Sequence, residues 1–410
     1  MRQAKGNLCI VACALGLFVA FSQKNGGSDR HAKHTGTVMT RIGVWNTAFL
    51  GDAILTLPLL QTLRALYPDA VVDFWVRKGV GSLFADHPAI TNVYEYDKRG
   101  KDRGAWRSLQ LGRRIAEKQY GLWISAHGSF RSGIIARWSR AAMRIGYAEP
   151  ISNALFYTHT VPRAFAEYDE IERLLRLLQP LEGEKRSFPL VDWPEITVAQ
   201  ESRDAAACFF ASLRAESAAP VLGIHPGSVW ATKRWPLEYF ADIAARAAKK
   251  GASVLVFGGP GAEEGMAAET VDLAKFGLSK TEQEKIINLA GKLSLPELAA
   301  YIGNLSCYLT NDSGPMHLAW PQRTPVTALF GPTVRSLGFF PRGESATVME
   351  LPLACRPCGL HGAEKCPLGH HLCMRDMTPD VVWADVAPKT FGFTPTFSEK
   401  SPPPGGENVD

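Results

Sequence analysis

The sequence has little of what marks the specialised classes of protein. Eight Cys in 410 residues are too few for a small domain held together by disulfides. With 45 Lys and Arg against 40 Asp and Glu, the net charge of +5 is too small to indicate a nucleic-acid-binding protein. We detect no short-period repeat. Hydrophobic residues (46%) and charged residues (21%) occur at globular levels, which excludes general disorder and predicts two domains or one very large one.

The N-terminus lacks an apolar run long enough to cross a membrane. Leu8–Phe21 has 14 residues and follows Arg2 and Lys5, whereas a helix that spans a bilayer needs about 20. A charged start and a short apolar run are typical of a signal peptide. The first predicted strand begins just after Met39, however, and the motifs below require cytosolic substrates. We therefore favour a start at Met39 or a dispensable extension.

Predicted strands alternate with predicted helices through most of the chain. The strands are expected at Arg41–Trp45, Val71–Val76, Leu122–Ser125, Val221–His225, Ser253–Phe257, Cys307–Thr310 and Val326–Phe330. The helices are expected at Asp52–Leu66, Ser132–Ala142, Val198–Ala215, Pro236–Lys249, Leu295–Gly303 and Pro315–Trp320. This alternation predicts an α/β fold with parallel sheets, in which ligands meet the loops after the strands. A stretch rich in Pro, Glu and Ser, 180–220, separates two such series, so we expect two α/β halves with a cleft between them.

The first motif, Gly51-Asp52, follows a predicted strand and leads into a predicted helix. Asp is common at a helix N-cap, where it is worth about 1 kcal/mol. At the cleft the Asp52 carboxylate could instead take a proton from an incoming hydroxyl group. A helix N-terminus would lower the pKa of Asp52, which keeps it charged but makes it a weaker base.

A second motif runs from His225 to Pro236 with the sequence HPGSVWATKRWP. Lys233 stands just before a predicted helix, and Pro is favoured in a first helical turn. Small hydroxyl residues (Ser228 and Thr232) and one Lys, next to free backbone N–H groups, suit a phosphate. The alternative is a lysine exposed to solvent in a loop.

A glycine-rich turn, FGGPGAEE, occupies residues 257–264 after a predicted strand. Its glycines are spaced one residue away from the G-x-G-x-x-G pattern of dinucleotide-binding folds, so the match is weak. We interpret this segment as a turn in which Glu263 or Glu264 is available for a ribose hydroxyl.

The most specific motif is TNDSGPMHLA at residues 310–319. Ser313 and Gly314 precede a proline, so their amide groups are expected at an exposed helix N-terminus, an arrangement that binds a diphosphate. Asp312 would be repelled by phosphate and suits hydrogen bonds to sugar hydroxyls. His317 is as compatible with a packing role as with a ligand contact.

Positive charge gathers in the first half of the chain. Lys98–Arg144 holds twelve Lys and Arg against Asp102 and Glu117. Much of this charge fits a solvated helix face, but Arg131 and Ser132 follow a predicted strand and are better placed for the cleft. We therefore expect an anionic acceptor here, and attraction to a negatively charged membrane surface without insertion.

Four cysteines lie close together late in the sequence, at Cys355, Cys358, Cys366 and Cys373. The first pair has a spacing found in zinc sites, but the second pair does not fit a ribbon-type site. Free thiols, structural zinc and disulfides are all open, and disulfides are the least expected because cytosolic proteins stay reduced.

Together these motifs resemble the ADP-heptose:lipopolysaccharide heptosyltransferases of glycosyltransferase family 9. The resemblance spans Arg41 to Val386, and the combination is far more specific than any single motif. It is carried by GD-x-x-L-T-x-P-L at 51–59, HPGS…KRWP at 225–236, FGGP at 257–260, NDSGPMHLA at 311–319, FGPT at 330–333 and the late cysteines.

The resemblance implies a GT-B architecture, in which two Rossmann-like α/β domains with parallel sheets face a central cleft. The acceptor would bind to the first domain and the nucleotide sugar to the second. The expected divisions are a dispensable or signal-like extension at 1–38, an acceptor-binding domain at 39–195, a nucleotide-sugar-binding domain at 196–377, a segment at 378–397 that packs back on the N-terminal domain, and a disordered tail at 398–410.

The family also implies an inverting transfer of heptose from ADP-heptose to the lipopolysaccharide inner core (Kdo-lipid A or heptosyl-Kdo), without a metal or other cofactor. By motif, Asp52 would be the base that activates the acceptor hydroxyl, and Lys233 would neutralise the leaving diphosphate. Preorganised positive charge and N–H groups at a departing diphosphate lower the barrier. The expected donor-binding residues are Ser228, Thr232, Lys233, Glu263, Asp312, Ser313, Gly314 and His317, and the expected acceptor-binding residues are Arg131 and Ser132.

We expect a cytoplasmic monomer, peripheral at the cytosolic face of the inner membrane, with ADP-heptose and an anionic lipopolysaccharide core as partners and no nucleic acid. Two alternatives stay open. A nucleotide-sugar epimerase of the same fold would need no acceptor, and the basic stretch argues against it. A non-catalytic sugar-nucleotide-binding protein would be expected to lack the base or the lysine, yet Asp52 and Lys233 are both present.

Overall fold

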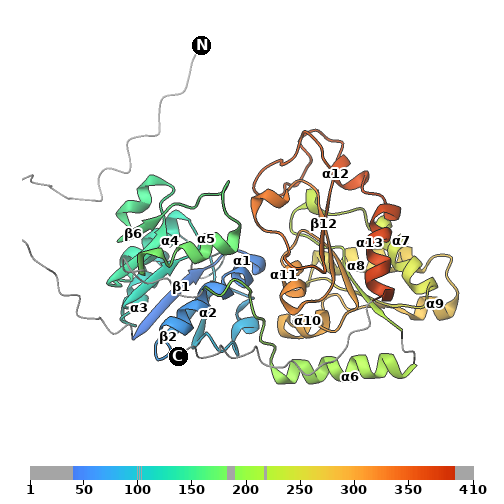
Figure 1. Ribbon diagram of the computed structural model, residues 1–410, viewed down its shortest axis with the longest axis horizontal. Coiled ribbons are helices and arrows are strands. Elements are labelled where there is room, and N and C mark those ends of the chain that lie inside the picture. The colour runs from blue at the N-terminus through green and yellow to red at the C-terminus, as the bar shows by residue number, and fades with distance from the viewer. Residues whose placement is uncertain are drawn as a thin grey trace, which may run out of the picture. The chain divides into compact units, whose positions relative to one another are not determined.

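Six parallel strands form the sheet of the N-terminal lobe (Figure 1). The computed structural model describes residues 40–98, 100, 102, 104–181, 190–216 and 219–392. In spatial order the strands are β3 (Asn92–Tyr96), β2 (Val71–Arg77), β1 (Arg41–Asn46), β4 (Leu122–Ser125), β5 (Met143–Tyr147) and β6 (His159–Val161). Since every neighbouring pair is parallel, all the carboxyl ends lie at one edge of the sheet. The extension expected at 1–38, the start at Met39 and the tail at 398–410 lie outside the described residues.

A second sheet of six parallel strands forms the C-terminal lobe. In spatial order these are β12 (Ala346–Glu350), β11 (Val326–Phe330), β10 (Cys307–Asn311), β7 (Val221–His225), β8 (Ser253–Val256) and β9 (Ile286–Asn288). Strands β7, β10 and β11 are buried along their whole length. Continuous burial of this kind is typical of parallel strands covered by helices on both faces.

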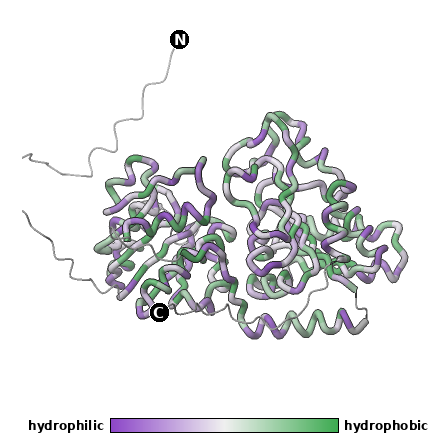
Figure 2. Tube along the Cα trace, viewed as in Figure 1, coloured by the Kyte–Doolittle hydropathy of each residue, from purple (hydrophilic) through white to green (hydrophobic). Residues whose placement is uncertain are grey.

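Helices follow most of the strands. Those of the N-terminal half are α1 (Leu50–Leu55), α2 (Leu57–Leu66), α3 (Ala105–Ala116), α4 (Phe130–Trp138), α5 (Glu170–Arg176) and α6 (Gln200–Glu216). Those of the C-terminal half are α7 (Leu237–Lys249), α8 (Ala262–Lys275), α9 (Lys280–Glu284), α10 (Leu295–Ile302), α11 (Met316–Ala319), α12 (Leu372–Arg375) and α13 (Pro379–Gly392). The 3-10 turns are η1 (Gly81–Phe84), η2 (Ile151–Leu155), η3 (Gln179–Leu181), η4 (Ala231–Lys233), η5 (Trp320–Gln322) and η6 (Arg335–Leu337). Hydrophilic and hydrophobic residues alternate along α6 (Figure 2), whose buried Phe210 packs against Tyr301 of α10.

Both sheets have the strand order that is typical of dinucleotide-binding folds. If each lobe is numbered separately, its strands run 3-2-1-4-5-6. Ligands of such sheets bind where the order reverses, beyond the carboxyl ends of strands 1 and 4. These positions follow β1 and β4 in the N-terminal lobe, and β7 and β10 in the C-terminal lobe. The motifs singled out in the sequence lie in these loops, apart from the glycine-rich turn, which follows β8.

One predicted helix is broken in two. The sequence predicted a single helix over 52–66, whereas α1 ends at Leu55 and α2 begins at Leu57, with Thr56 between them. Pro58 explains the break, because proline has no N–H to donate to the preceding turn and its ring crowds the carbonyl four residues earlier.

The C-terminal segment packs on a different lobe from the one expected. Residues 378–397 were predicted to return to the N-terminal domain, but α13 lies against α7 and β10 of the C-terminal lobe (Figure 1). Val382 and Val386 enter the core of that lobe. Lys389 donates a hydrogen bond to the Val326 carbonyl at 3.1 Å. The prediction is therefore wrong for the helix, because its apolar residues complete the second core.

Within the residues that the structure describes, no helix has the combination of length and apolar composition needed to cross a bilayer.

Candidate active site

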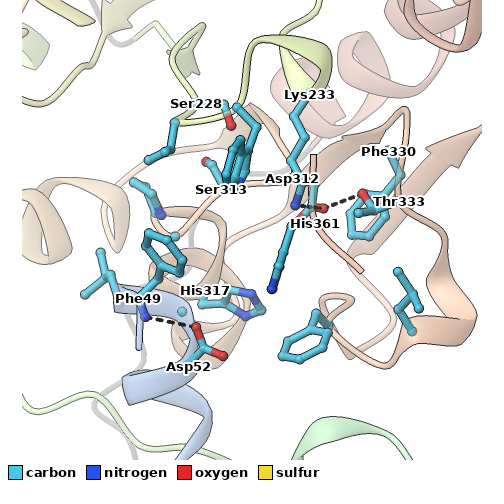
Figure 3. A pocket seen from close by; sticks show the side chains of 18 of the residues that line it. Phe49, Asp52, Ser228, Lys233, Asp312, Ser313, His317, Phe330, Thr333 and His361 are labelled. Atoms are coloured by element: carbon cyan, nitrogen blue, oxygen red, sulfur yellow. Dashed lines mark hydrogen bonds and ion pairs between the residues drawn. The ribbon is translucent and has the colours of Figure 1, made fainter. Parts of the chain in front are cut away.

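A pocket of about 230 Å³ is lined by both lobes. The N-terminal lobe contributes the start of α1, and the C-terminal lobe contributes the loops after β7, β8, β10 and β11. Figure 3 shows Asp52 from the first lobe together with Lys233 and Asp312 from the second. The pocket unites the following predicted site residues: Asp52, Ser228, Lys233, Glu263, Asp312, Ser313, Gly314 and His317.

Asp52 is the third residue of α1 and is therefore not the N-cap. Phe49 holds the cap position, and its N–H donates a hydrogen bond to Oδ2 of Asp52 at 3.1 Å. Burial raises the pKa of Asp52 above its ordinary value and outweighs the Phe49 N–H and the charge of Arg163, which lower it. The expectation of a lowered pKa is wrong, and Asp52 is a stronger base than a solvent-exposed aspartate.

Gly51 allows the two lobes to approach closely. A Cβ built on Gly51 would lie 2.6 Å from Cδ2 of His317, and one built on Gly314 would lie 3.1 Å from Cβ of Leu50. The first distance is too short for any real Cβ, so a side chain at Gly51 would push α1 away from α11. The glycine of the Gly51-Asp52 motif is thus required by the packing beside Asp52.

His317 both packs in the interior and lines the pocket. Nε1 of Trp320 donates a hydrogen bond to Nδ1 of His317 at 3.2 Å, which assigns the ring proton to Nε2. Burial lowers the pKa of His317 to about 4, against the opposing effect of Asp312. The ring is therefore neutral at physiological pH and offers a hydrogen-bond donor.

Lys233 reaches the pocket from η4 and forms an ion pair there. Its Nζ lies 2.5 Å from Oδ2 of Asp312, and Thr333 Oγ1 donates a second hydrogen bond to that oxygen at 2.6 Å (Figure 3). Both charged side chains are largely buried. Removing one partner of a buried pair leaves the other charge uncompensated, which costs about 3–5 kcal/mol. The alternative of a solvent-exposed lysine is therefore wrong, and Asp312 holds the ammonium group in place.

Thr232 does not line the pocket, and its polar groups bind another segment of the chain. Its N–H donates to the Ala363 carbonyl at 3.0 Å, and its hydroxyl accepts from the Ala363 N–H at 2.8 Å. Nε2 of His371 lies 2.8 Å from the Thr232 carbonyl oxygen. Thr232 thus joins the cysteine-bearing segment to the loop that carries Lys233.

Of the two glutamates left open by the sequence, Glu263 faces the pocket and Glu264 caps α8. The Gly261 N–H donates to Oε1 of Glu264 at 2.8 Å. Oε2 of Glu263 accepts from the Gly259 N–H at 2.7 Å and lies 3.1 Å from Nε2 of His225. Burial raises the pKa of Glu263, but His225 and the Gly259 N–H outweigh it and bring the pKa to about 2. Glu263 is therefore ionised and can only accept hydrogen bonds.

Ser313 and Gly314 lie at the pocket, but the helix behind them is short. α11 begins at Met316 and ends at Ala319. A single turn supplies its N-terminal N–H groups but little of the dipole of a longer helix. The amides themselves, and not a helix field, are what this loop offers to an anion.

Arg131 and Ser132 lie in a second pocket, of about 420 Å³, inside the N-terminal lobe. Oγ of Ser132 accepts a hydrogen bond from Nε1 of Trp45 at 3.1 Å and lies 2.8 Å from Oγ of Ser129. Its hydroxyl is therefore engaged in the wall of this pocket. The second pocket is lined by Trp45, Thr47, Tyr96, Lys98, Ser108, His127, Ser129, Phe130, Arg131, Ser132 and Ile134. The structure thus does not bring the two expected acceptor residues into the pocket of Asp52.

Arg163 acts electrostatically on both pockets. Its charge lowers the pKa of Asp52, and it adds to burial and to Lys98 in lowering the pKa of His127 to about 4. The Arg163 guanidinium is held by both carboxylate oxygens of Glu170, at 3.0 and 3.2 Å. The base and the second pocket are therefore both within electrostatic range of one arginine.

The sequence missed several residues of the pocket. Phe330 and Thr333 belong to the FGPT segment, whose position after β11 could have pointed to them. His361 comes from the cysteine-bearing segment, and no pattern in the sequence pointed to it. Its position depends on how that segment folds against Trp230 and Lys233, which touch the place where a Cβ of Gly362 would lie.

None of the four late cysteines forms a disulfide bond. In the part of the chain that the structure describes, no three His, Cys, Asp or Glu side chains are grouped as a metal site.

Two α/β lobes with parallel sheets share a pocket that is lined by a carboxylate of one lobe and a lysine of the other, which is the architecture of GT-B proteins. The model of glycosyltransferase family 9 (heptosyltransferase) matches residues 108–366, more than half of the chain. The chain belongs to this family.

Curated relatives and solved structures agree with this assignment. Lipooligosaccharide heptosyltransferase 2 of Campylobacter jejuni is 35% identical over 163 residues, 40% of this chain and 48% of that protein, so the match spans about half of the relative. Lipopolysaccharide heptosyltransferase 2 of Salmonella typhimurium is 28% identical over 352 residues, 83% of this chain and 96% of that protein. The structure of Escherichia coli ADP-heptose lipopolysaccharide heptosyltransferase II has a TM-score of 0.69 at 23% identity and covers 86% of this chain and 99% of that one. The expected GT-B fold is confirmed.

Proposed function

We propose that this protein is an inverting, metal-independent heptosyltransferase that moves heptose from ADP-heptose to the inner core of lipopolysaccharide. The observation that carries the proposal is the shared pocket, which is lined by the half-buried carboxylate of Asp52 from one lobe and by the Lys233–Asp312 pair of the other. The names of the relatives, lipopolysaccharide heptosyltransferase 2 among them, support the choice of donor and acceptor.

Asp52 is the proposed base. Its Oδ2 accepts the Phe49 N–H, so Oδ1 is the oxygen that takes the proton of the acceptor hydroxyl. As that proton leaves, the acceptor oxygen attacks the anomeric carbon, and the bond from this carbon to the diphosphate oxygen breaks. A single displacement from the opposite face inverts the configuration. The raised pKa of Asp52 favours this step, because proton transfer improves as the pKa of the base approaches the working pH.

Lys233 and the amides of Ser313 and Gly314 are proposed to stabilise the departing ADP. Negative charge develops on the diphosphate as the bond breaks, and fixed positive groups at that point lower the barrier. Asp312 keeps the Lys233 ammonium in position before the donor arrives, since Nζ is held at 2.5 Å. Ser228 and the neutral His317 are proposed as further donor contacts.

Glu263 is proposed to receive a hydroxyl of the donor ribose. One carboxylate oxygen is occupied by Gly259 and His225, and the side chain lines the pocket. An ionised carboxylate fits a pair of hydroxyl donors. Oδ2 of Asp312 is bound by Lys233 and Thr333, and the other carboxylate oxygen of Asp312 is proposed to accept hydrogen bonds from hydroxyls of the transferred sugar.

The acceptor is proposed to approach from the N-terminal lobe, with its anionic groups near Arg131. The protein is proposed to act as a cytoplasmic monomer, because one chain completes the pocket, and to attach peripherally to the cytosolic face of the inner membrane. The twelve Lys and Arg of 98–144 support that attachment.

The test is nucleotide release from a panel of nucleotide sugars, with and without heptose-deficient lipopolysaccharide. We expect ADP release that requires both ADP-heptose and the acceptor, and a product whose new linkage has the inverted configuration. Chelator should leave the rate unchanged. Release without acceptor would contradict transfer, and loss of activity with chelator would contradict the metal-independent step.

A further inference from the structure

Exposed apolar side chains of the N-terminal lobe lie along one edge. Of the residues described between 40 and 181, the large apolar side chains exposed to solvent are Trp106 (65%), Phe130 (62%), Ile151 (91%) and Leu155 (75%). Each follows the carboxyl end of a strand, namely β3, β4 or β5. Parallel strands present these ends at the same edge of the sheet, so the four side chains share one side of the lobe.

Contacts between the supporting elements make this surface continuous. Phe130 packs edge-on against Phe156, with 5.3 Å between ring centroids. Phe156 in turn covers Gly133 of α4, where a Cβ would lie 2.5 Å from its ring. Helices α3 and α4 pack side by side (Figure 1), and Ser108 of α3 lines the same pocket as Phe130. The helix starts that carry Trp106 and Phe130 therefore flank the second pocket.

The helices beneath this edge are positively charged. The sequences of α3 and α4 contain five arginines and no Asp or Glu: Arg107, Arg113, Arg114, Arg131 and Arg137. The neighbouring acids are few. Asp102 is buried and lies 3.8 Å from Arg114, and Glu149 accepts the Arg163 N–H. Exposed apolar side chains among arginines that outnumber the neighbouring acids are typical of a surface that lies on an anionic bilayer.

We propose that Trp106, Phe130, Ile151 and Leu155, together with the arginines of α3 and α4, form a docking surface for an anionic lipid bilayer. The apolar side chains enter the headgroup region, and the arginines bind the lipid phosphates. The second pocket then opens toward the membrane, where it can receive the anionic sugar of a lipid-anchored acceptor. The identity of the acceptor rests on the proposed function, but the docking surface does not.

The first test is binding of the full chain to vesicles of phosphatidylglycerol and phosphatidylethanolamine. The variant Trp106→Ser/Ile151→Ser/Leu155→Ser should reduce the vesicle-bound fraction at least tenfold, and Arg107→Gln/Arg137→Gln should reduce it on these vesicles but not on phosphatidylcholine. A matched control, Phe276→Ser, removes an apolar side chain that is 89% exposed on the other lobe and should change nothing. Equal binding by wild type and the triple variant would overturn the proposal.

A second measurement keeps the test local. Amide hydrogen exchange in α3, α4 and η2 should slow when anionic vesicles are added. This measurement reports on these three elements alone, so binding of vesicles by other segments does not affect it. Unchanged exchange in all three elements would overturn the docking surface and would favour a protein partner for the patch.

Transfer assays separate this proposal from the proposed function. The triple variant leaves both pockets intact, so with a detergent-dispersed acceptor it should turn over like the wild type, whereas on vesicle-embedded acceptor it should slow at least tenfold. Vesicle binding through these residues in a chain that transfers no sugar would refute the proposed function and support the surface. Normal transfer on vesicles by the triple variant would refute the docking surface and support the proposed function.

Discussion

The two lobes have the same strand order but carry different chemistry at the same edge. After β1 and β4 the N-terminal lobe presents the carboxylate of Asp52, several arginines and exposed apolar side chains. After β7 and β10 the C-terminal lobe presents a lysine, small residues and their backbone amides. The two edges therefore differ in the loops that the shared topology supports and not in the topology itself. Neither edge holds the whole pocket, since Asp52 and Lys233 come from different lobes.

Removing the base tests the N-terminal half of this comparison and should have the largest effect. We expect Asp52→Ala to lower kcat by a factor of about 10²–10⁴, the usual contribution of a positioned base. The fold should lose about 1–2 kcal/mol at most, because only the hydrogen bond from Phe49 is lost. Nucleotide release and thermal unfolding measure the two effects. Turnover at the wild-type rate would exclude Asp52 as the base.

Removing the lysine tests the C-terminal half. Lys233→Ala should weaken ADP binding and lower kcat by about 10²-fold, since charge stabilisation of the leaving group is lost. This change also leaves the buried Asp312 carboxylate without its ion-pair partner. The double variant Lys233→Ala/Asp312→Asn therefore serves as the stability control. Calorimetric titration with ADP is the measurement. An unchanged ADP affinity in both variants would place the diphosphate elsewhere.

A side chain at Gly51 tests whether close contact between α1 and α11 is needed for transfer. Gly51→Ala places a Cβ 2.6 Å from the His317 ring and should lower kcat/KM for transfer about tenfold, the order expected for a small misplacement of a base. ADP affinity should fall less than kcat/KM, because the new Cβ meets only His317 among the proposed donor residues and leaves Lys233 untouched. Gly265→Ala is a matched control, since nothing lies within 4 Å of its Cβ. Equal transfer by Gly51→Ala would show that the contact does not set the position of the base.

The pH dependence gives the smallest but most specific effect. Transfer requires ionised Asp52, so kcat/KM should fall as the pH drops through the raised pKa of Asp52, which lies above the ordinary value of 3.8. Arg163 lowers that pKa, so Arg163→Gln should move the acidic limb to higher pH. The pH profiles of the wild type and this variant provide the comparison. Limbs that coincide would mean that the titrating group is not Asp52.

Much of the fold could be predicted because its central strands are continuously apolar. The strands at 122–125, 221–225 and 326–330 have the predicted limits. Five strands, β3, β5, β6, β9 and β12, were missed because none of them is buried along its whole length. Local patterns cannot identify strands whose environment is fixed only by the finished sheet.

The candidate site could be predicted where a motif follows a strand directly, as Asp312 follows β10. Thr232 lies outside the pocket because its hydroxyl binds Ala363, 131 residues away in the sequence. Arg131 and Ser132 were expected in the cleft, but the wall of the second pocket uses the Ser132 hydroxyl. His361 could not be found, since its place depends on a tertiary contact. Sequence spacing predicts which residues lie near the end of a strand, but it does not predict the direction in which their side chains point.

The tether between Lys233 and Asp312 has a consequence for selectivity among the abundant anions of a cell. An ammonium group already compensated by a carboxylate is a poor trap for a lone monophosphate, which must compete with a partner that cannot diffuse away. A ligand that also engages the neighbouring amides and the Glu263 carboxylate has further contacts with which to win that competition. The Lys233 charge is thus already compensated before any ligand binds, so the loop favours a ligand that makes several contacts over a lone anion.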